Sequence, residues 1–200
     1  VLALVEAVLL GADWGLWGGP LWRSLAYQYG ALWAGLWQDW QPNFAAQPWT
    51  MFATHAVLHA GPGHLAGNML VLAWLGGAVR ARLGPGRFAL VWILAVFGGG
   101  AAFVALPDSA APVVGASGGI FGLAGALIVL RAAAARAAGG RRRIVLAQAA
   151  GLFLAAAALN AAIWALEGGH IAWQTHLGGL AAGGLAAALL LLRTGGRAAR

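Results

Sequence analysis

Long apolar runs, separated by short polar or glycine- and proline-containing breaks, make up most of this chain. A helix needs about 20 predominantly apolar residues to cross the hydrocarbon core of a bilayer. Runs near that length predict six transmembrane helices, over residues 1–17, 63–82, 88–106, 113–131, 144–166 and 171–192. The expected fold is therefore all-α, a polytopic membrane helix bundle that forms a single domain over residues 1–200.

The segment 18–62 departs from this pattern, because it is too apolar for a simple loop and too interrupted for a span. Its tryptophans and prolines are Trp22, Trp33, Trp37, Trp40 and Trp49, and Pro20, Pro42, Pro48 and Pro62. Tryptophan favours the boundary between membrane and water. We interpret the segment as a membrane-interfacial first loop of short helices or a partly embedded hairpin; an ordinary packed loop is the alternative.

Composition supports a membrane protein. The chain is 62% hydrophobic and 8% charged, whereas soluble domains carry about 25% charged residues. Cysteine is absent, which excludes disulfides and thiolate metal sites. Residues 1–17 lack the basic region and cleavage site of a signal peptide. We interpret them as a first span of a longer natural chain, and the sequence does not tell what precedes Val1.

The net charge of +7 comes from arginine alone, since lysine is absent. Six spans place eleven of the twelve arginines on one side of the membrane and leave Arg23 on the other. The eleven are Arg80, Arg82, Arg87, Arg131, Arg136, Arg141, Arg142, Arg143, Arg193, Arg197 and Arg200. Arginine-rich loops are cytoplasmic. The charge therefore predicts topology, with the arginine side inside the cell, and no nucleic-acid partner.

Polar side chains on three predicted spans meet at one depth in the outer half of the membrane. Ser117 lies about four residues into the fourth span and His176 about five into the sixth, roughly 6–8 Å below the boundary. The second span carries His64 and, one helical turn later, Asn68 on the same face. Buried polar groups need partners, and ionisable residues inside spans are functional candidates. The coincidence of depth indicates a shared site.

Glycines four residues apart surround both Ser117 and His176. The pairs are Gly115 and Gly119, Gly118 and Gly122, and Gly179 and Gly183. Small residues at this spacing let helix backbones approach closely. The fourth and sixth spans are therefore expected to pack together and to bring Ser117 within hydrogen-bond reach of His176. The alternative is helix packing alone, with Ser117 as a small residue and His176 bonded to a backbone carbonyl.

The motifs "GASG" on the fourth span, "HLAGN" opening the second and "HLGGLAAG" on the sixth resemble the rhomboid intramembrane serine proteases, over about Trp49–Leu192. The resemblance implies a dyad without an acid, in which Ser117 is the nucleophile and His176 the general base. It also implies an oxyanion site formed by the backbone N–H of Ser117, the Asn68 amide and His64. No metal or other cofactor is implied.

Two further histidines, His55 and His59, have the i, i+4 spacing of zinc ligands on a helix. The zinc-protease motif needs Glu directly after the first His, and Ala56 stands there. We therefore expect His55 and His59 to be structural and to hydrogen-bond the first loop to the second span.

The chain departs from the family pattern at two points. Thr50 and Met51 occupy the positions of a frequent Trp-Arg pair, which leaves the role of the first loop open. Phe121 stands where a tyrosine often follows the serine by four residues, and its ring is still able to pack on His176.

The expected function is an intramembrane serine endopeptidase that cleaves single-pass membrane proteins in or near their transmembrane segments. The expected location is the bacterial inner membrane, with the active site toward the outer face. The alternatives are an inactive rhomboid-like protein that binds membrane clients, a small transporter or channel, and a purely structural membrane protein. The sequence does not reveal the natural substrate, its cleavage site, the oligomeric state or the regulation.

Overall fold

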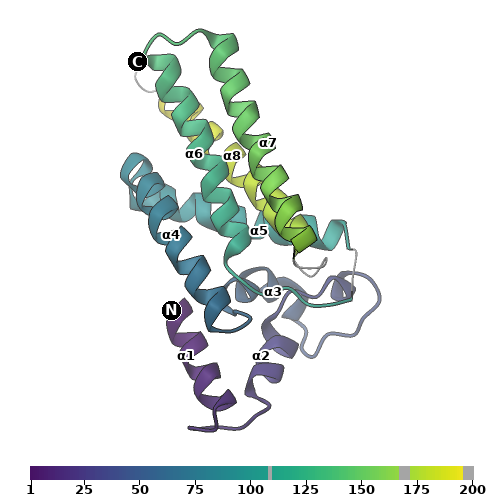
Figure 1. Cartoon of the computed structure of the whole chain (residues 1–200). Helices are drawn as coiled ribbons and strands as arrows, with labels where there is room; N and C mark the ends of the chain where they lie inside the picture. Colours follow the sequence, from purple (N-terminus) through teal and green to yellow (C-terminus); the bar gives the residue numbers. More distant parts are fainter. Residues whose placement is uncertain (108–109, 167–171, 196–200) are drawn as a thin grey trace.

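The computed structural model describes residues 1–107, 110–166 and 172–195, and its regular elements there are helices (Figure 1). In chain order they are α1 (Leu2–Asp13), α2 (Trp22–Gly30), the 3-10 turn η1 (Ala34–Trp37), α3 (Gln47–Thr54), the 3-10 turn η2 (His55–Val57), α4 (Pro62–Leu83), α5 (Pro85–Ala105), α6 (Ser117–Ala137), α7 (Arg142–Leu166) and α8 (Trp173–Gly195). Arg197, Arg200 and residue 171, which the topology prediction used, lie outside the described residues.

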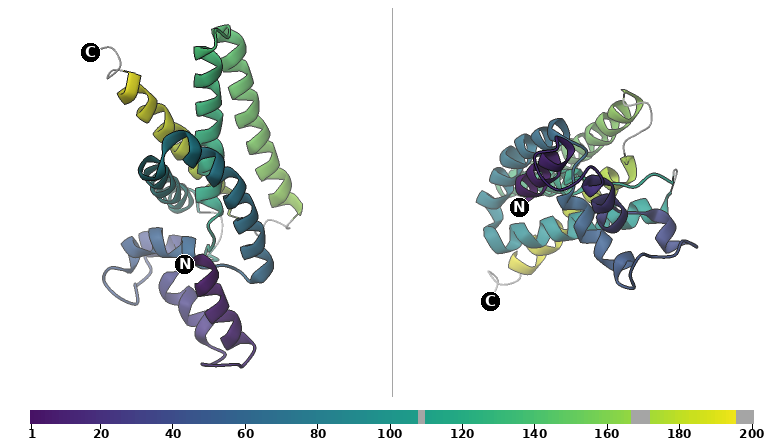
Figure 2. Two further views of the ribbon diagram at one scale, coloured as in Figure 1. Left: turned by 90° about the vertical axis from the view of Figure 1, so that its left-hand side faces the viewer. Right: turned by 90° about the horizontal axis from the view of Figure 1, so that it is seen from below.

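Two parts of the molecule are visible in Figures 1 and 2. The long helices α4–α8 form a bundle, and the short helices α1–α3 lie at one end of it. The first residues of α4, α6 and α8 lie near that end, and the α6–α7 connection lies at the other (Figure 1). Arg80 and Arg82 are in the last turn of α4, and Arg136 is in the last turn of α6. These arginines therefore lie at the ends of helices that run away from α1–α3, whereas Arg23 is on α2.

Within the described residues, four helices are long and apolar enough to cross a membrane: Pro85–Ala105, Ser117–Ala137, Arg142–Ala161 and Trp173–Arg193, with mean hydropathy from 1.7 to 2.2. α4 has 22 residues, enough for about 33 Å, but His64, Asn68, Arg80 and Arg82 make its composition more polar. α1 has 12 residues and is about 18 Å long. The predicted count of six transmembrane helices is therefore not confirmed, and the expected first span over 1–17 corresponds to a shorter helix.

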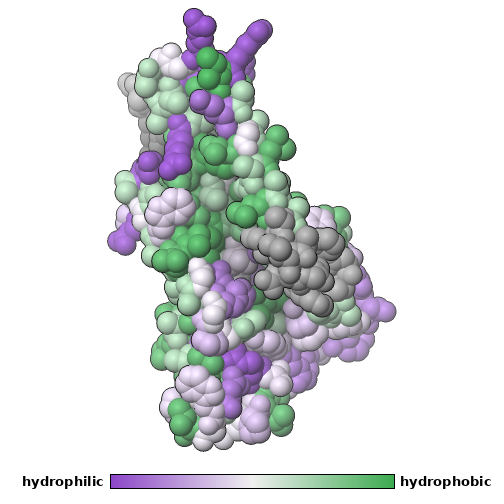
Figure 3. Space-filling view, viewed as in Figure 1, coloured by the Kyte–Doolittle hydropathy of each residue, from purple (hydrophilic) through white to green (hydrophobic). Residues whose placement is uncertain are grey.

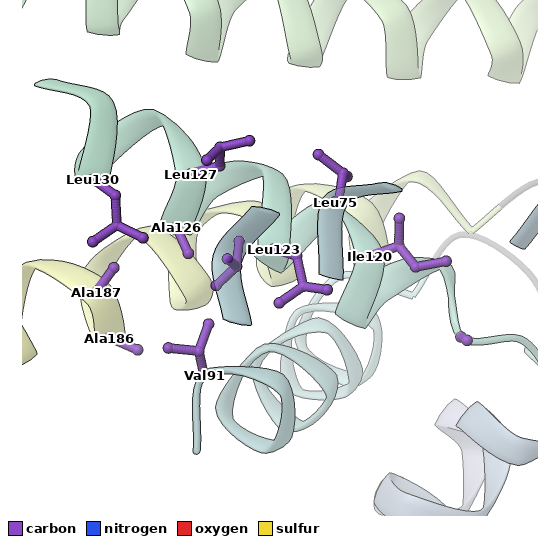
Figure 4. Close-up of a cluster of buried hydrophobic side chains, with 11 residues drawn as sticks. Leu75, Val91, Ile120, Leu123, Ala126, Leu127, Leu130, Ala186 and Ala187 are labelled. Carbon is purple, nitrogen blue, oxygen red and sulfur yellow. The ribbon is translucent and has the colours of Figure 1, made fainter. Parts of the chain in front are cut away.

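The core of the bundle lies around α6, which is covered by α4, α5 and α8. Leu123 and Ala126 of α6 are fully buried against Leu75 of α4, Val91 of α5 and Ala187 of α8 (Figure 4). On the outside, large apolar side chains are exposed, among them Leu70, Trp74 and Leu154. Such a surface is unusual for a soluble protein but suits contact with lipid. Figure 3 shows an apolar middle, with hydrophilic groups over the α6–α7 connection and in the region of α1–α3.

The segment 18–62 is folded around its aromatic side chains. The ring of Trp37 meets the edge of Trp49 at 4.7 Å and that of Phe52 at 5.8 Å between centroids. Reciprocal backbone hydrogen bonds of 2.9 Å join Leu32 to Val113, just before α6. The segment is therefore packed onto the bundle close to the start of α6, and its place at the membrane surface stays a prediction.

Met51, at one of the positions where the family often has a Trp-Arg pair, is fully buried. It packs with Leu32 and Phe103 in a second apolar cluster beneath the first loop. Thr50 sits in the same helix, and its hydroxyl donates to the carbonyl of Gln47 at 3.5 Å. In this chain, the buried apolar side chain of Met51 therefore holds the first loop in place, without the arginine of the Trp-Arg pair.

A partly buried ionic cluster joins α1, α2 and the turn before α4. Glu6 of α1 is fully buried and pairs with the guanidinium of Arg23 at 2.9 Å, and Asp13 pairs with the same group at 2.7 Å. Arg23 also donates to the backbone carbonyl of His59 at 2.9 Å. Burial alone would lower the pKa of Arg23, but hydrogen bonds to the two carboxylates raise it above its ordinary value. The cluster ties α1 and α2 to the turn that leads into His64.

Candidate active site

Ser117 is the first residue of α6, at the end of the bundle nearest to α1–α3. Gly115 precedes the helix in a sharp bend, with φ +127°, and a Cβ there would lie 2.7 Å from Cε1 of His64. The backbone N–H of Gly115 donates to the carbonyl of His55 at 2.9 Å. Gly115 was expected on a helical packing face, and this is wrong, because the helix begins only at Ser117. Its small size instead lets the His64 ring lie against the bend.

His176 lies in the first turn of α8, and its Nε2 is 2.9 Å from Oγ of Ser117. The imidazole is mostly buried, with 8% of its residue surface exposed. The ring of Phe121 stacks on it with a centroid distance of 4.4 Å and an interplanar angle of 4°. The structure thus brings together two residues 59 positions apart in the sequence. A hydroxyl within hydrogen-bond reach of a ring nitrogen is the geometry of a nucleophile and its base.

Asn160 of α7 is a polar neighbour of His176 that the sequence interpretation missed. Its Oδ1 lies 2.7 Å from Nδ1 of His176, and its Nδ2 donates to the carbonyl of Trp173 at 3.2 Å. One signal was present in the sequence, because an asparagine interrupts the otherwise apolar run near the end of the fifth predicted span. A polar residue inside a span needs a partner. The residues reveal that need but not which helix provides the partner.

Glycines allow α6 and α8 to touch along their backbones. A Cβ on Gly179 would overlap the carbonyl oxygen of Gly118, and one on Gly183 would overlap that of Gly122. Both contacts are with backbone atoms, which cannot turn aside as a side chain does. The close approach of the two helices therefore depends on the absence of side chains at these positions, and it fixes the distance between Ser117 and His176.

The other two candidate oxyanion groups lie on α4. His64 Nδ1 accepts the backbone N–H of Ala60 at 3.3 Å, and the ring lies against Gly115. Asn68 is buried, and its side-chain Nδ2 donates to the backbone carbonyl of His64 at 2.9 Å. At least one Asn68 amide proton is thus engaged within its own helix, four residues back. The first N–H groups of α6 have no carbonyl partner within the helix, and they begin at Ser117.

His55 and His59 lie in the first loop beside the site. His55 is buried, its Nδ1 is 2.8 Å from the carbonyl of Met51, and burial lowers its pKa to about 4. His59 is fully buried, and its ring meets the ring of His64 edge-on at 5.4 Å. Burial also lowers the pKa of His59. Both histidines are therefore expected to be neutral near pH 7.

The expected hydrogen bonds from the His55 and His59 rings to the second span are wrong, because the His55 ring contacts the carbonyl of Met51 within the first loop itself. Neither ring nitrogen of His59 has a hydrogen-bond partner within the part of the chain that the structure describes. Its backbone carbonyl makes the link instead, accepting from Arg23 at 2.9 Å and from the hydroxyl of Tyr27 at 2.8 Å. The ring is buried because the turn between η2 and α4 presses it against His64.

Several apolar helices of membrane-spanning length, with polar side chains gathered at one end of the bundle, define a multi-pass integral membrane protein. The family model of the Rhomboid domain matches residues 45–193. The chain therefore belongs to the rhomboid family, as the motifs around Ser117, His64 and His176 indicated.

Curated relatives match shorter segments. Rhomboid protease GluP of Bacillus subtilis (strain 168) is 46% identical over 81 residues, which are 40% of this chain and 15% of the relative. Rhomboid-related protein 3 of Homo sapiens is 36% identical over 87 residues, 44% of this chain and 21% of the relative. RHOMBOID-like protein 1 of Arabidopsis thaliana is 39% identical over 80 residues, 40% and 20% respectively. The chain thus covers about a fifth or less of the length of these relatives.

Proposed function

We propose that this protein is an intramembrane serine endopeptidase that uses Ser117 as nucleophile and His176 as general base. The observation that carries the proposal is the 2.9 Å distance between Ser117 Oγ and His176 Nε2, in a partly buried site at one end of a membrane helix bundle. Membership of the rhomboid family and the likeness to a relative named as a rhomboid protease support the same class of reaction.

The reaction follows from this pair. As Ser117 Oγ attacks the scissile carbonyl, His176 Nε2 takes its proton, and the C–O bond forms. The tetrahedral intermediate collapses when the imidazolium returns the proton to the leaving amine, which breaks the C–N bond and leaves an acyl-enzyme. Water then attacks the ester, His176 again takes and returns one proton, and the acid product and free serine form.

The negative oxygen of the intermediate needs donors placed before the reaction. The backbone N–H of Ser117 lies at the positive end of the α6 helix dipole. The His64 ring lies against Gly115, two residues before Ser117, and Asn68 is one turn further along α4. Asn68 would contribute once its amide also reaches the substrate oxygen. Loss of one such donor typically lowers the rate about 10²–10³-fold.

The wider setting is part of the proposal. Residues 1–200 form one rhomboid-like membrane domain with six transmembrane helices. Two of the six are α1, which is shorter than a usual span, and α4, which is more polar than one. The helix ends that carry the arginines face the cytoplasm, so the dyad faces the outer side of a bacterial inner membrane. Substrates are single-pass membrane proteins whose helix unwinds locally near its outer end, where helix-weakening residues favour cleavage.

The first test needs no knowledge of the substrate. The detergent-solubilised protein is treated with a fluorophosphonate probe, and the adduct is located by mass spectrometry in the wild type, Ser117→Ala and His176→Ala. Labelling at Ser117 that is lost in both variants is expected. A folded wild type that is not labelled would contradict the proposal and favour an inactive, client-binding rhomboid protein. Ser117→Ala that still cleaves a transmembrane peptide would exclude Ser117 as the nucleophile.

A further inference from the structure

We propose that Asn160 is a positioning residue that holds His176 in the tautomer a general base requires. This inference rests on the proposed protease function. It extends the dyad by one neutral group, located on a helix that carries neither Ser117 nor His176.

The burial of Asn160 sets it apart from the rest of α7. Among the α7 side chains that the structure describes, over residues 142–161, Val145 and Asn160 are buried and the others are partly or fully exposed. Asn160 keeps 2% of its surface exposed. An amide buried without hydrogen bonds is unfavourable, because it gives up its bonds to water without replacing them. Asn160 avoids that penalty through its two contacts, and both lead to the first turns of α8.

The contact with Trp173 fixes which end of the amide faces the histidine. The Trp173 carbonyl can only accept a hydrogen bond, so the amide NH₂ must be the group that faces it, at 3.2 Å. The amide oxygen then faces Nδ1 of His176 at 2.7 Å. An amide oxygen can only accept, so Nδ1 must carry the proton.

The tautomer of His176 follows. In a neutral imidazole one ring nitrogen carries the proton and the other has a lone pair. With the proton on Nδ1, the lone pair is on Nε2, which lies 2.9 Å from Ser117 Oγ. The serine hydroxyl therefore donates to Nε2, as proton abstraction requires. The other tautomer would place an N–H toward Ser117 and an unprotonated nitrogen against the amide oxygen, so Asn160 disfavours it.

A neutral amide orients the imidazole without adding a negative charge beside it. Among the described residues, the hydrogen-bond partners of the His176 ring are Asn160 and Ser117, and neither is a carboxylate. An ionised carboxylate at position 160 would add a charge that stabilises the imidazolium. It would also face the Trp173 carbonyl without a proton to donate, unless it were itself protonated. Asn160→Asp and Asn160→Ala therefore perturb the site in different, predictable ways.

The kinetic test compares the wild type with Asn160→Ala, Asn160→Asp and Gln148→Ala. Gln148 is a matched control, because it is an exposed amide on the same helix. Asn160→Ala is expected to lower kcat for a transmembrane peptide about tenfold and to leave KM unchanged, because the imidazole loses one neutral hydrogen bond that orients it. Asn160→Asp is expected to shift the acid limb of kcat/KM to higher pH. Gln148→Ala should match the wild type. An unchanged kcat and pH profile in both Asn160 variants would overturn the inference.

A second measurement does not depend on activity. The ¹⁵N NMR shifts of the ring nitrogens, assigned by comparison with His176→Ala, report which nitrogen is protonated. We expect the Nδ1–H tautomer in the wild type and a mixture in Asn160→Ala. A wild type protonated on Nε2 at neutral pH would refute the positioning role even if Asn160→Ala failed to fold. Failure of the proposed function would show separately, as a folded wild type that the fluorophosphonate does not label.

Discussion

Replacing Gly179 by alanine tests whether direct backbone contact between α6 and α8 creates the Ser117–His176 pair. A Cβ at Gly179 would overlap the carbonyl oxygen of Gly118, the residue that follows Ser117. A comfortable contact needs about 3.5 Å, so the two helices would have to move apart by about 1.5 Å. Overpacking of this kind typically destabilises a fold by about 1–3 kcal/mol.

The same displacement acts on the site. The Ser117–His176 distance of 2.9 Å would lengthen beyond hydrogen-bond range, which ends near 3.5 Å. A misplacement of about 1 Å lowers rates by up to about 10²-fold. We therefore expect Gly179→Ala to lower both Tm and the rate of fluorophosphonate labelling, the latter about 10²-fold. The two are measured on the same detergent-solubilised sample.

Gly151 on α7 provides the matched control. A Cβ there meets nothing within 4 Å, and alanine is favoured over glycine in a helix by about 0.5–1 kcal/mol. Gly151→Ala should therefore leave labelling unchanged and maintain or raise Tm. If Gly179→Ala behaved like Gly151→Ala in both measurements, the backbone contact would not be what sets the geometry of the site.

Three further perturbations follow from the first loop. Arg23→Ala leaves the buried Glu6 carboxylate without its partner, and we expect it to lower the unfolding free energy by about 3–5 kcal/mol. Adding Glu6→Gln should recover most of this loss. No recovery in the double variant would show that the ion pair is not the cause. Burial lowers the pKa of His55 to about 4, so between this pH and its ordinary pKa of 6.5 the unfolded chain binds a proton that the folded chain excludes. The free energy of unfolding should therefore fall as pH drops from about 6.5 to about 4, by at most about 3 kcal/mol. Equally steep stability curves for the wild type and His55→Gln would refute this. His59→Ala should lower Tm, because the ring packs against His64, and should leave the rate of fluorophosphonate labelling within a few-fold of the wild-type rate. A large loss of labelling rate at unchanged Tm would indicate a catalytic role.

Distance along a helix could be inferred directly from the sequence. Each residue adds about 1.5 Å to a helix, so the positions of Ser117, His176 and His64 within their apolar runs place them at similar depths. The Gly-x3-Gly spacing around Gly118 and Gly179 also indicated which helix faces would meet, and in the structure these glycines face each other. Phe121 follows Ser117 by four residues and so lies on the same face of α6, where its ring stacks on His176.

The ends of helices and the partners of buried polar groups could not be inferred in this way. The start of α6 at Ser117, rather than at residue 113, depends on the bend at Gly115 and on its contact with His64 from another helix. The burial of Glu6 against Arg23 depends on how α1 and α2 pack together.

By itself, the sequence determined that this protein lies in a membrane, that it resembles the rhomboid family, and that a serine and two histidines lie at one level. Hydrophobic length and residue spacing are properties of single segments and need no knowledge of their neighbours. Only the tertiary structure decided that Asn160 reaches Nδ1 of His176 and that the His59 carbonyl, not its ring, binds Arg23. These contacts depend on how each helix is rotated and which helix lies beside it, and both are set by the packing of the whole chain.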